Sequence, residues 1–192
     1  MNGIWPSGAN RMLTKQNVRA YFMSFFGRLF GTEADPKEEL RPLWLWVVNE
    51  ARNPVWYREC GASDTVDGRF DMITNVLAIA MLRLEQNGEL IAESSRLTEL
   101  FVDDMEGQLR ELGFGDPTLG KKMGEMMEAM GGRLGAFRTA IPEGLEATTA
   151  VVIRNANLTE GSDGSAMAQR LIAVSHSLSA APNDRVLAGF PD

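Results

Sequence analysis

Residues 101–133 read FVDDMEGQLRELGFGDPTLGKKMGEMMEAMGGR, which contains the end of one predicted helix, a short corner with glycines, and the start of a second helix. The first helix carries apolar residues at spacings of three and four, which places them on one helical face: Leu97, Phe101, Met105, Leu109 and Leu112. Gly113 suits the residue just after a helix. Asp116 as an N-cap and Pro117 at the first helical position predict that the second helix begins within one residue of Pro117.

The second helix has its own apolar stripe, which is expected to face the first: Met123, Met126, Met130, Leu134, Phe137 and Ile141, with Met127 at the edge. Methionine is flexible and polarizable, so a cluster of methionines suits either a buried core or an apolar groove that accepts a partner helix. Both interpretations stay open at this point. The adjacent Gly131 and Gly132 inside the predicted helix suggest a kink or a close backbone contact.

The composition indicates one domain with a core of its own, because 44% of the 192 residues are hydrophobic. Cys60 is the single cysteine, which excludes an intrachain disulfide framework and a multi-cysteine zinc site and fits a reducing compartment. No apolar run approaches the roughly 18 to 20 residues that a membrane-spanning helix needs. We therefore expect a cytoplasmic protein, with peripheral contact at the inner membrane as a further candidate.

The net charge of −7 is unevenly distributed along the chain. Residues 1–31 carry four basic residues and no acid, which leaves −11 for the remainder. An acidic body repels phosphates, so we expect no nucleic acid as a partner of this part. Residues 18–30, VRAYFMSFFGRLF, interleave aromatic and basic residues as an interfacial amphipathic helix does. This helix is expected to dock on the body, or to contact a membrane surface or a partner; Met23 is an alternative start of the chain.

The pattern predicts an all-α, single-domain bundle of about six to eight helices. The expected division is a basic, aromatic N-terminal arm and linker at 1–36, an all-α domain at 37–181, and a mobile tail at 182–192. Pro142, Glu143 and Gly144 are expected to break the chain between helices. The helices are expected at residues 38–53, 55–60, 64–88, 89–112, 117–140, 145–155 and 165–178.

No catalytic, cofactor or metal site is predicted. Residues 115–122, GDPTLGKK, fit G-x-x-x-x-G-K, but a phosphate-binding loop needs a preceding strand and a Ser or Thr after the lysine. His176 is the sole histidine, so the glutamate–histidine pairs of di-iron bundles are missing, and acidic residues such as Asp103 and Glu106 are read as solvated faces or ion pairs. Arg69 is expected to pair with Asp67 or Asp71. A histidine-free magnesium site stays as a minor alternative.

Several ordered motifs resemble the ubiquinol–cytochrome c chaperone family over about residues 40–141. The resemblance is carried by Ala51-Arg52-Asn53-Pro54, Trp56-Tyr57, 64–71 (DTVDGRFD), Asp104-Met105, Leu109-Arg110-Glu111, Gly113, Gly115-Asp116, Gly120-Lys121 and Gly132-Arg133. It implies an all-helical, non-enzymatic chaperone that holds newly made cytochrome b of the bc1 complex. A small partner protein and the ribosome are the further partners it implies. A helical interaction or scaffold module with a different partner is the alternative.

The resemblance and the methionine cluster together give two sets of candidate residues. The candidate contacts with a client or partner are Arg52, Asp104, Met105, Arg110, Glu111, Lys121, Met123, Met126, Met127, Met130 and Arg133. The candidate structural positions are Asp64, Thr65, Asp67, Arg69, Asp71, Gly113, Gly115, Asp116 and Pro117. The chain departs from the family where Asn75-Val76 replaces a common Leu-His pair and where Gly131 replaces a common tyrosine.

Overall fold

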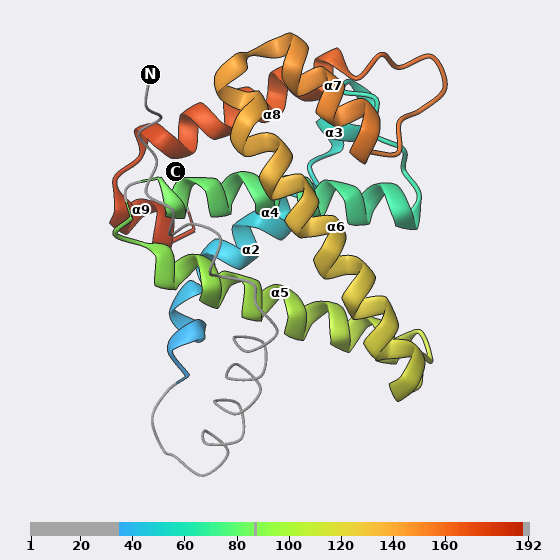
Figure 1. Cartoon of the computed structure of the whole chain (residues 1–192), viewed down its shortest axis with the longest axis vertical. Helices are drawn as coiled ribbons and strands as arrows, with labels where there is room; N and C mark the ends of the chain where they lie inside the picture. The colour runs from blue at the N-terminus through green and yellow to red at the C-terminus, as the bar shows by residue number, and fades with distance from the viewer. Residues whose placement is uncertain (1–34, 87, 190–192) are drawn as a thin grey trace, which may run out of the picture. The chain divides into compact units, whose positions relative to one another are not determined.

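The computed structural model describes residues 35–86 and 88–189. Within these ranges the secondary-structure elements are all helices (Figure 1). The all-α prediction is therefore confirmed. The elements are η2 (Pro36–Leu40), α2 (Arg41–Ala51), α3 (Pro54–Arg58), α4 (Val66–Glu85), α5 (Ile91–Glu111), α6 (Asp116–Glu143), α7 (Leu145–Asn155), α8 (Ser165–Ala180) and α9 (Asn183–Leu187). The predictions for the arm, including the helix over 18–30, lie outside the described residues.

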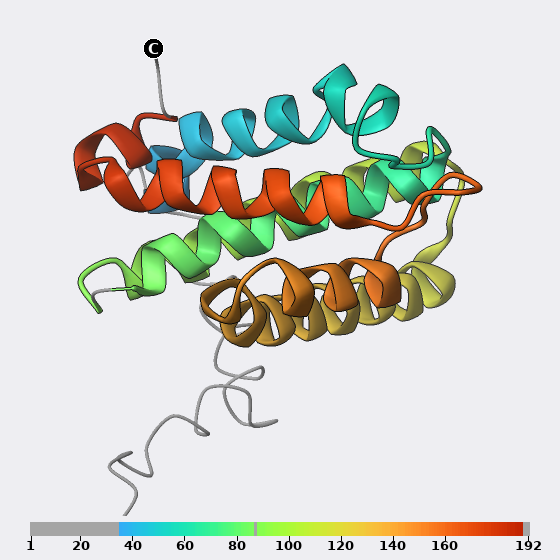
Figure 2. The ribbon, with the colours of Figure 1, turned by 90° about the horizontal axis from the view of Figure 1, so that it is seen from above.

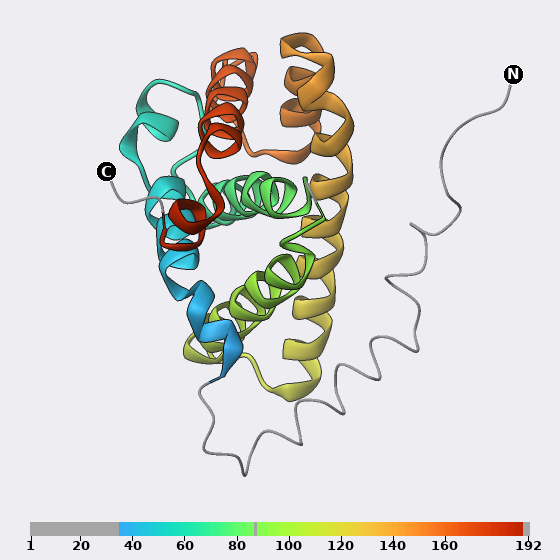
Figure 3. The same cartoon turned by 90° about the vertical axis from the view of Figure 1, so that its left-hand side faces the viewer.

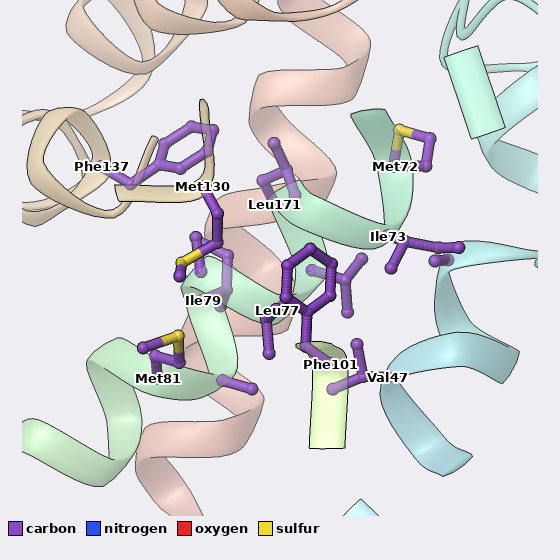
Figure 4. Packing of buried hydrophobic residues seen from close by; sticks show 14 of the residues in the cluster. Val47, Met72, Ile73, Leu77, Ile79, Met81, Phe101, Met130, Phe137 and Leu171 are labelled. Atoms are coloured by element: carbon purple, nitrogen blue, oxygen red, sulfur yellow. The ribbon is translucent and has the colours of Figure 1, made fainter. Parts of the chain in front are cut away.

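Helix α4 is the centre of this part of the chain. Residues 71–81 are buried without interruption, as expected for a helix that is apolar on nearly all sides. Helices α2, α5, α6 and α8 all pack against α4, and Figures 2 and 3 show it between them. Figure 4 shows the packing from close by, with Leu77 of α4, Phe101 of α5 and Val47 of α2 in one apolar cluster.

Helix α4 begins with a side-chain cap at Thr65, one of the candidate structural positions. The Thr65 hydroxyl accepts a hydrogen bond from the Gly68 amide at 3.1 Å, which satisfies one of the free N–H groups of the first turn. Gly68 is required for a different reason, because a Cβ there would lie 2.0 Å from the Ser63 carbonyl oxygen. The motif 64–71 is thus a helix start in which the capping residue and the glycine each have a local structural role.

Helix α6 begins within one residue of Pro117, as predicted, but its N-cap and its end differ from the prediction. Asp116 is the first residue of the helix rather than its N-cap; Gly115 holds the N-cap position, without a side-chain hydrogen bond. At the other end, α6 continues through Pro142, where the proline lies in the last turn and interrupts little of the hydrogen-bond ladder. Gly144, with φ of 99°, ends the helix.

The glycines of α6 do not mark close packing. A Cβ placed at Gly120, Gly124, Gly131, Gly132 or Gly135 would meet no atom within 4 Å. The prediction of a close backbone contact at the adjacent glycines is therefore wrong. Because glycine in a helix interior costs about 1 kcal/mol relative to alanine, these positions weaken α6 without a packing benefit within the described residues.

The C-terminal segment is ordered further than predicted. Residues 183–187 form α9, and Val186 is fully buried. Arg83 of α4 holds this segment, donating hydrogen bonds of 2.8 Å to the carbonyls of Leu178 and Ala181 and to the Asn183 side chain. The expected mobile tail is therefore wrong for this part of 182–192.

None of the described helices combines the length and the apolar character that crossing a membrane requires.

Candidate functional site

A buried ion pair connects α6 to the central helix. Arg133 donates to the Asp71 carboxylate, and the two side chains are 7% and 10% exposed. The second Asp71 oxygen accepts from the backbone and side-chain nitrogens of Asn157, at 2.9 and 2.7 Å. Arg133 also donates to the Asn155 carbonyl. One carboxylate and one guanidinium thus join α4, α6, the end of α7 and the residues that follow it.

The electrostatics of this pair reflect burial and charge together. Burial lowers the pKa of the Arg133 guanidinium, and the neighbouring Asp71 carboxylate opposes that effect. Arginine keeps its proton at neutral pH even so, because its ordinary pKa lies far above neutrality. The charge of Arg133 is therefore balanced inside the protein by Asp71, and a contact of Arg133 with a partner stays a prediction.

Unpartnered polar atoms lie along the same interface. Within the described residues, both amide atoms of Asn75 and the Nε atom of Arg133 are buried without a hydrogen-bond partner. Asn75 follows Asp71 by one helical turn, so it lies on the same face of α4, toward α6. A buried polar group left without a partner costs about 1 to 3 kcal/mol, so the α4–α6 interface is weaker than its area suggests.

Two shallow pockets adjoin charged pairs. A pocket of about 270 Å³ lies beside the buried pair and is lined by Asp71, Ala129, Arg133, Arg154, Asn155, Ala156 and Asn157. A second pocket of about 330 Å³ lies between α2 and α8, where Arg170 pairs with Glu50 at 3.0 Å and lies 4.8 Å from the centre of the Trp56 ring. In both places the arginine is held by groups of the chain itself.

The methionines of the α5–α6 corner divide into two groups. Met105 and Met130 are 3% and 4% exposed and belong to the core, so they are not surface contacts. Met123, Met126 and Met127 are half-buried at its edge. Leu112, at the end of α5, is 69% exposed. Leu112 and these three methionines are thus the apolar residues of the corner that a partner can reach.

The charged contact candidates near the corner are mostly exposed. Arg110 pairs with Glu106 at 2.8 Å and with Asp116 at 3.1 Å, which connects the end of α5 to the start of α6. Glu111 and Lys121 are also exposed, and Lys121 lies 3.8 Å from Glu125. Hydrogen bonds to Glu106 and Asp116 favour the charged form of Arg110 and raise the pKa of its guanidinium.

The remaining candidates lie elsewhere or have other partners. Arg52 is exposed at the C-cap of α2, and half-buried Asp104 accepts a hydrogen bond from Gln108 at 2.9 Å. Arg69 pairs with exposed Asp64 at 2.7 Å, and not with Asp67 or Asp71 as predicted, because its side chain points back toward the loop before α4.

Sequence reasoning missed several polar residues that organise the interior. Asn155 is predicted only as the end of a helix and Asn157 only as the start of a polar loop, yet the Asn155 carbonyl and the Asn157 side chain both bind the buried pair. Asn75 and Arg83 could have been predicted as buried polar residues, because each lies inside the apolar sequence of α4.

In residues 35–86 and 88–189, no three or more His, Cys, Asp or Glu side chains gather as a metal site would require. Cys60 is buried, and desolvation raises the pKa of its thiol, which is the opposite of what an activated nucleophile needs.

These features define an all-α protein whose buried charges hold helices together and in which exposed Leu112 and three half-buried methionines lie at the α5–α6 corner. A model of the family described as ubiquinol-cytochrome C chaperone matches residues 58–191, which is more than half of the chain. The chain belongs to the ubiquinol-cytochrome C chaperone family.

A solved structure supports the same fold. The crystal structure of the Cbp3 homolog from Brucella abortus superposes with a TM-score of 0.68, covering 90% of this chain and 93% of the other. The two sequences are 22% identical, so this likeness establishes the fold alone. A comparison with curated protein sequences finds no match. The resemblance stated from the motifs is thus confirmed at the level of the family and the fold.

Proposed function

We propose that this protein is a non-enzymatic assembly chaperone that holds newly made cytochrome b before it enters the bc1 complex. The observation that carries the proposal is the match of residues 58–191 to the ubiquinol-cytochrome C chaperone family. The geometry is compatible with a binding role, because the charged groups in the interior are occupied by structural partners. Arg133 and Arg83 are the main examples.

The proposed contact region is the corner surface, which we define as Leu112, Phe114, Met123, Met126 and Met127. Leu112 is exposed and the other four are half-buried. Methionine and other large apolar side chains at a surface suit varied apolar partners, because they adapt their shape to the surface that they meet. Exposed Arg110, Glu111 and Lys121 surround this region and would contact the polar ends of a client segment.

The basic, aromatic segment 18–30 is proposed as an accessory element at the membrane surface. Its aromatic residues suit the boundary between headgroups and acyl chains, and its basic residues suit anionic lipids. This segment would keep the protein in the cytoplasm at the inner membrane, near ribosomes that make the client. A small partner protein could share this task.

The test is an affinity capture from membranes and ribosomes of the native host, followed by mass spectrometry. The full chain is compared with Met126→Glu, which places a charge on the corner surface, and with Ile153→Glu as the matched control. Ile153 is an exposed apolar residue of α7. We expect cytochrome b with the full chain and with the control, and a reduction of about tenfold or more with Met126→Glu, because burying a charge at an apolar contact is costly.

The remaining outcomes separate the alternatives. A chain starting at Met23 that still captures cytochrome b would make residues 1–22 dispensable for binding. Absence of cytochrome b from every capture would overturn the proposal and leave a helical interaction module with another partner. Equal loss with both glutamate variants would place the contact away from the corner surface.

A further inference from the structure

Helix α6 is held unevenly along its length. Its second half contains Arg133, Phe137 and Ala140, all buried, and it packs on α4 and α7. In Figure 1 the first half lies beside the second half of α5, and the helix then crosses α4. Within residues 116–130 the fully buried side chains are Leu119 and Met130, whereas Met123, Met126 and Met127 pack against the core only partly buried. This half therefore has fewer fully buried anchors in proportion to its length than the second half.

The polar contacts of the first half add little to its attachment. The described ion pairs of Lys121 and Lys122 are with Glu125 of the same helix. The pair between Arg110 and Asp116 connects α5 to α6, but both side chains are more than half exposed. Exposed pairs of this kind contribute little, because water screens them.

Gly131 and Gly132 mark the boundary between the two halves. Neither has a positive φ, and a Cβ at either position would meet no atom of residues 35–86 and 88–189 within 4 Å. Packing and turn geometry therefore do not explain the two glycines. What distinguishes glycine here is its backbone freedom, which makes a helix easier to bend or open at that point.

The interface between α4 and α6 contains buried polar atoms without hydrogen-bond partners near the two glycines. The unpartnered Nε belongs to Arg133, the residue directly after the two glycines, and Asn75, whose amide atoms are also unpartnered, lies on the face of α4 toward α6. Unsatisfied polar groups favour opening, since exposure to water would provide the missing hydrogen bonds.

We infer that Gly131 and Gly132 form a hinge about which residues 116–130 swing away from α4 and α5, while residues 133–143 stay in place. The buried pair of Arg133 with Asp71 fixes the second half during this motion. Opening uncovers Leu119, Met130 and the apolar face of α5 against which the first half packs. The use of that face for an apolar client segment rests on the proposed function, whereas the opening itself does not.

Hydrogen–deuterium exchange on the full chain, without any client, tests the hinge. We expect the amides of residues 118–130 to exchange about tenfold faster or more than those of 133–140, as a locally opening segment does. The double variant Gly131→Ala and Gly132→Ala should slow exchange across 118–130. The matched control is Gly107→Ala with Gly135→Ala, two further helical glycines whose added Cβ would meet no neighbour.

The control should leave the exchange of 118–130 within about twofold of the original chain, because it adds helix propensity away from the hinge. Equal protection of the two halves of α6 would overturn the hinge. An equal slowing by the control pair would also overturn it, since the effect would then be general helix stabilisation. Because no client is present, a failure here is distinct from a failure to capture cytochrome b.

Discussion

Arg133 of α6 and Asp71 of α4 form a buried ion pair across 62 positions of sequence. Asn157 completes the hydrogen bonding of the carboxylate. This relationship assigns a structural role to two motifs that the sequence resemblance had placed in different categories. The pair also leads to the most specific prediction for the stability of the protein.

Removing one member of the pair should cost about 3 to 5 kcal/mol, because the other charge stays buried without compensation. The variants are Arg133→Met and Asp71→Leu, measured by urea unfolding with circular dichroism. The double variant should recover most of the loss, since both charges are then absent. Costs below about 1 kcal/mol for both single variants would contradict a tightly coupled pair.

Gly68→Ala should destabilise the chain by about 3 kcal/mol, because the new Cβ would lie against the Ser63 backbone and force α4 to shift. Gly124→Ala is the control, since the same change in α6 meets open space. That control should gain up to about 1 kcal/mol. Thermal unfolding of the two variants separates the effects, and equal behaviour would refute the close contact at Gly68.

Arg83→Met should loosen the C-terminal segment, because it removes three hydrogen bonds from a charged donor to residues 178–183. We expect a cost of about 3 kcal/mol and faster proteolysis between α8 and α9. Arg154→Met, at an exposed arginine of α7, should stay within about 0.5 kcal/mol. Unchanged proteolysis of the Arg83 variant would show that α9 is held by its apolar contacts alone.

Met130→Ala should cost about 2 to 5 kcal/mol, as a buried residue of the core does. Met126→Ala should cost about 1 kcal/mol or less, because this half-buried side chain loses less contact. Chemical denaturation of both variants gives the comparison. A larger loss at Met126 than at Met130 would reverse the assignment of core and surface.

Cys60 should react with iodoacetamide about tenfold or more slowly in the folded chain than in urea. The thiol is buried, and burial raises its pKa, which lowers the fraction of reactive thiolate. Mass spectrometry of the labelled chain follows the reaction over time. Equal rates in the two conditions would show that α3 and its following loop open readily.

Most of the helices could be predicted from the sequence. Apolar residues at spacings of three and four, the Thr65 cap and the Asn53–Pro54 pair are local signals, and α3, α4, α5 and α7 lie close to the predicted ranges. The errors arose where local signals compete. Asp116 and Gly115 are both plausible caps, and Pro142 breaks a helix in its interior but not in its last turn.

The sequence alone also determined the family, through long motifs in a fixed order, and the absence of a recognisable catalytic motif. Only the tertiary structure decided which residues of those motifs face inward. Arg133 and Met130 looked like contact residues by type and position, yet the crossing of α6 over α4 buries them, while Met126 stays at the edge. The reason is physical: helical periodicity is local to one segment, whereas burial and charge pairing depend on where two distant helices cross.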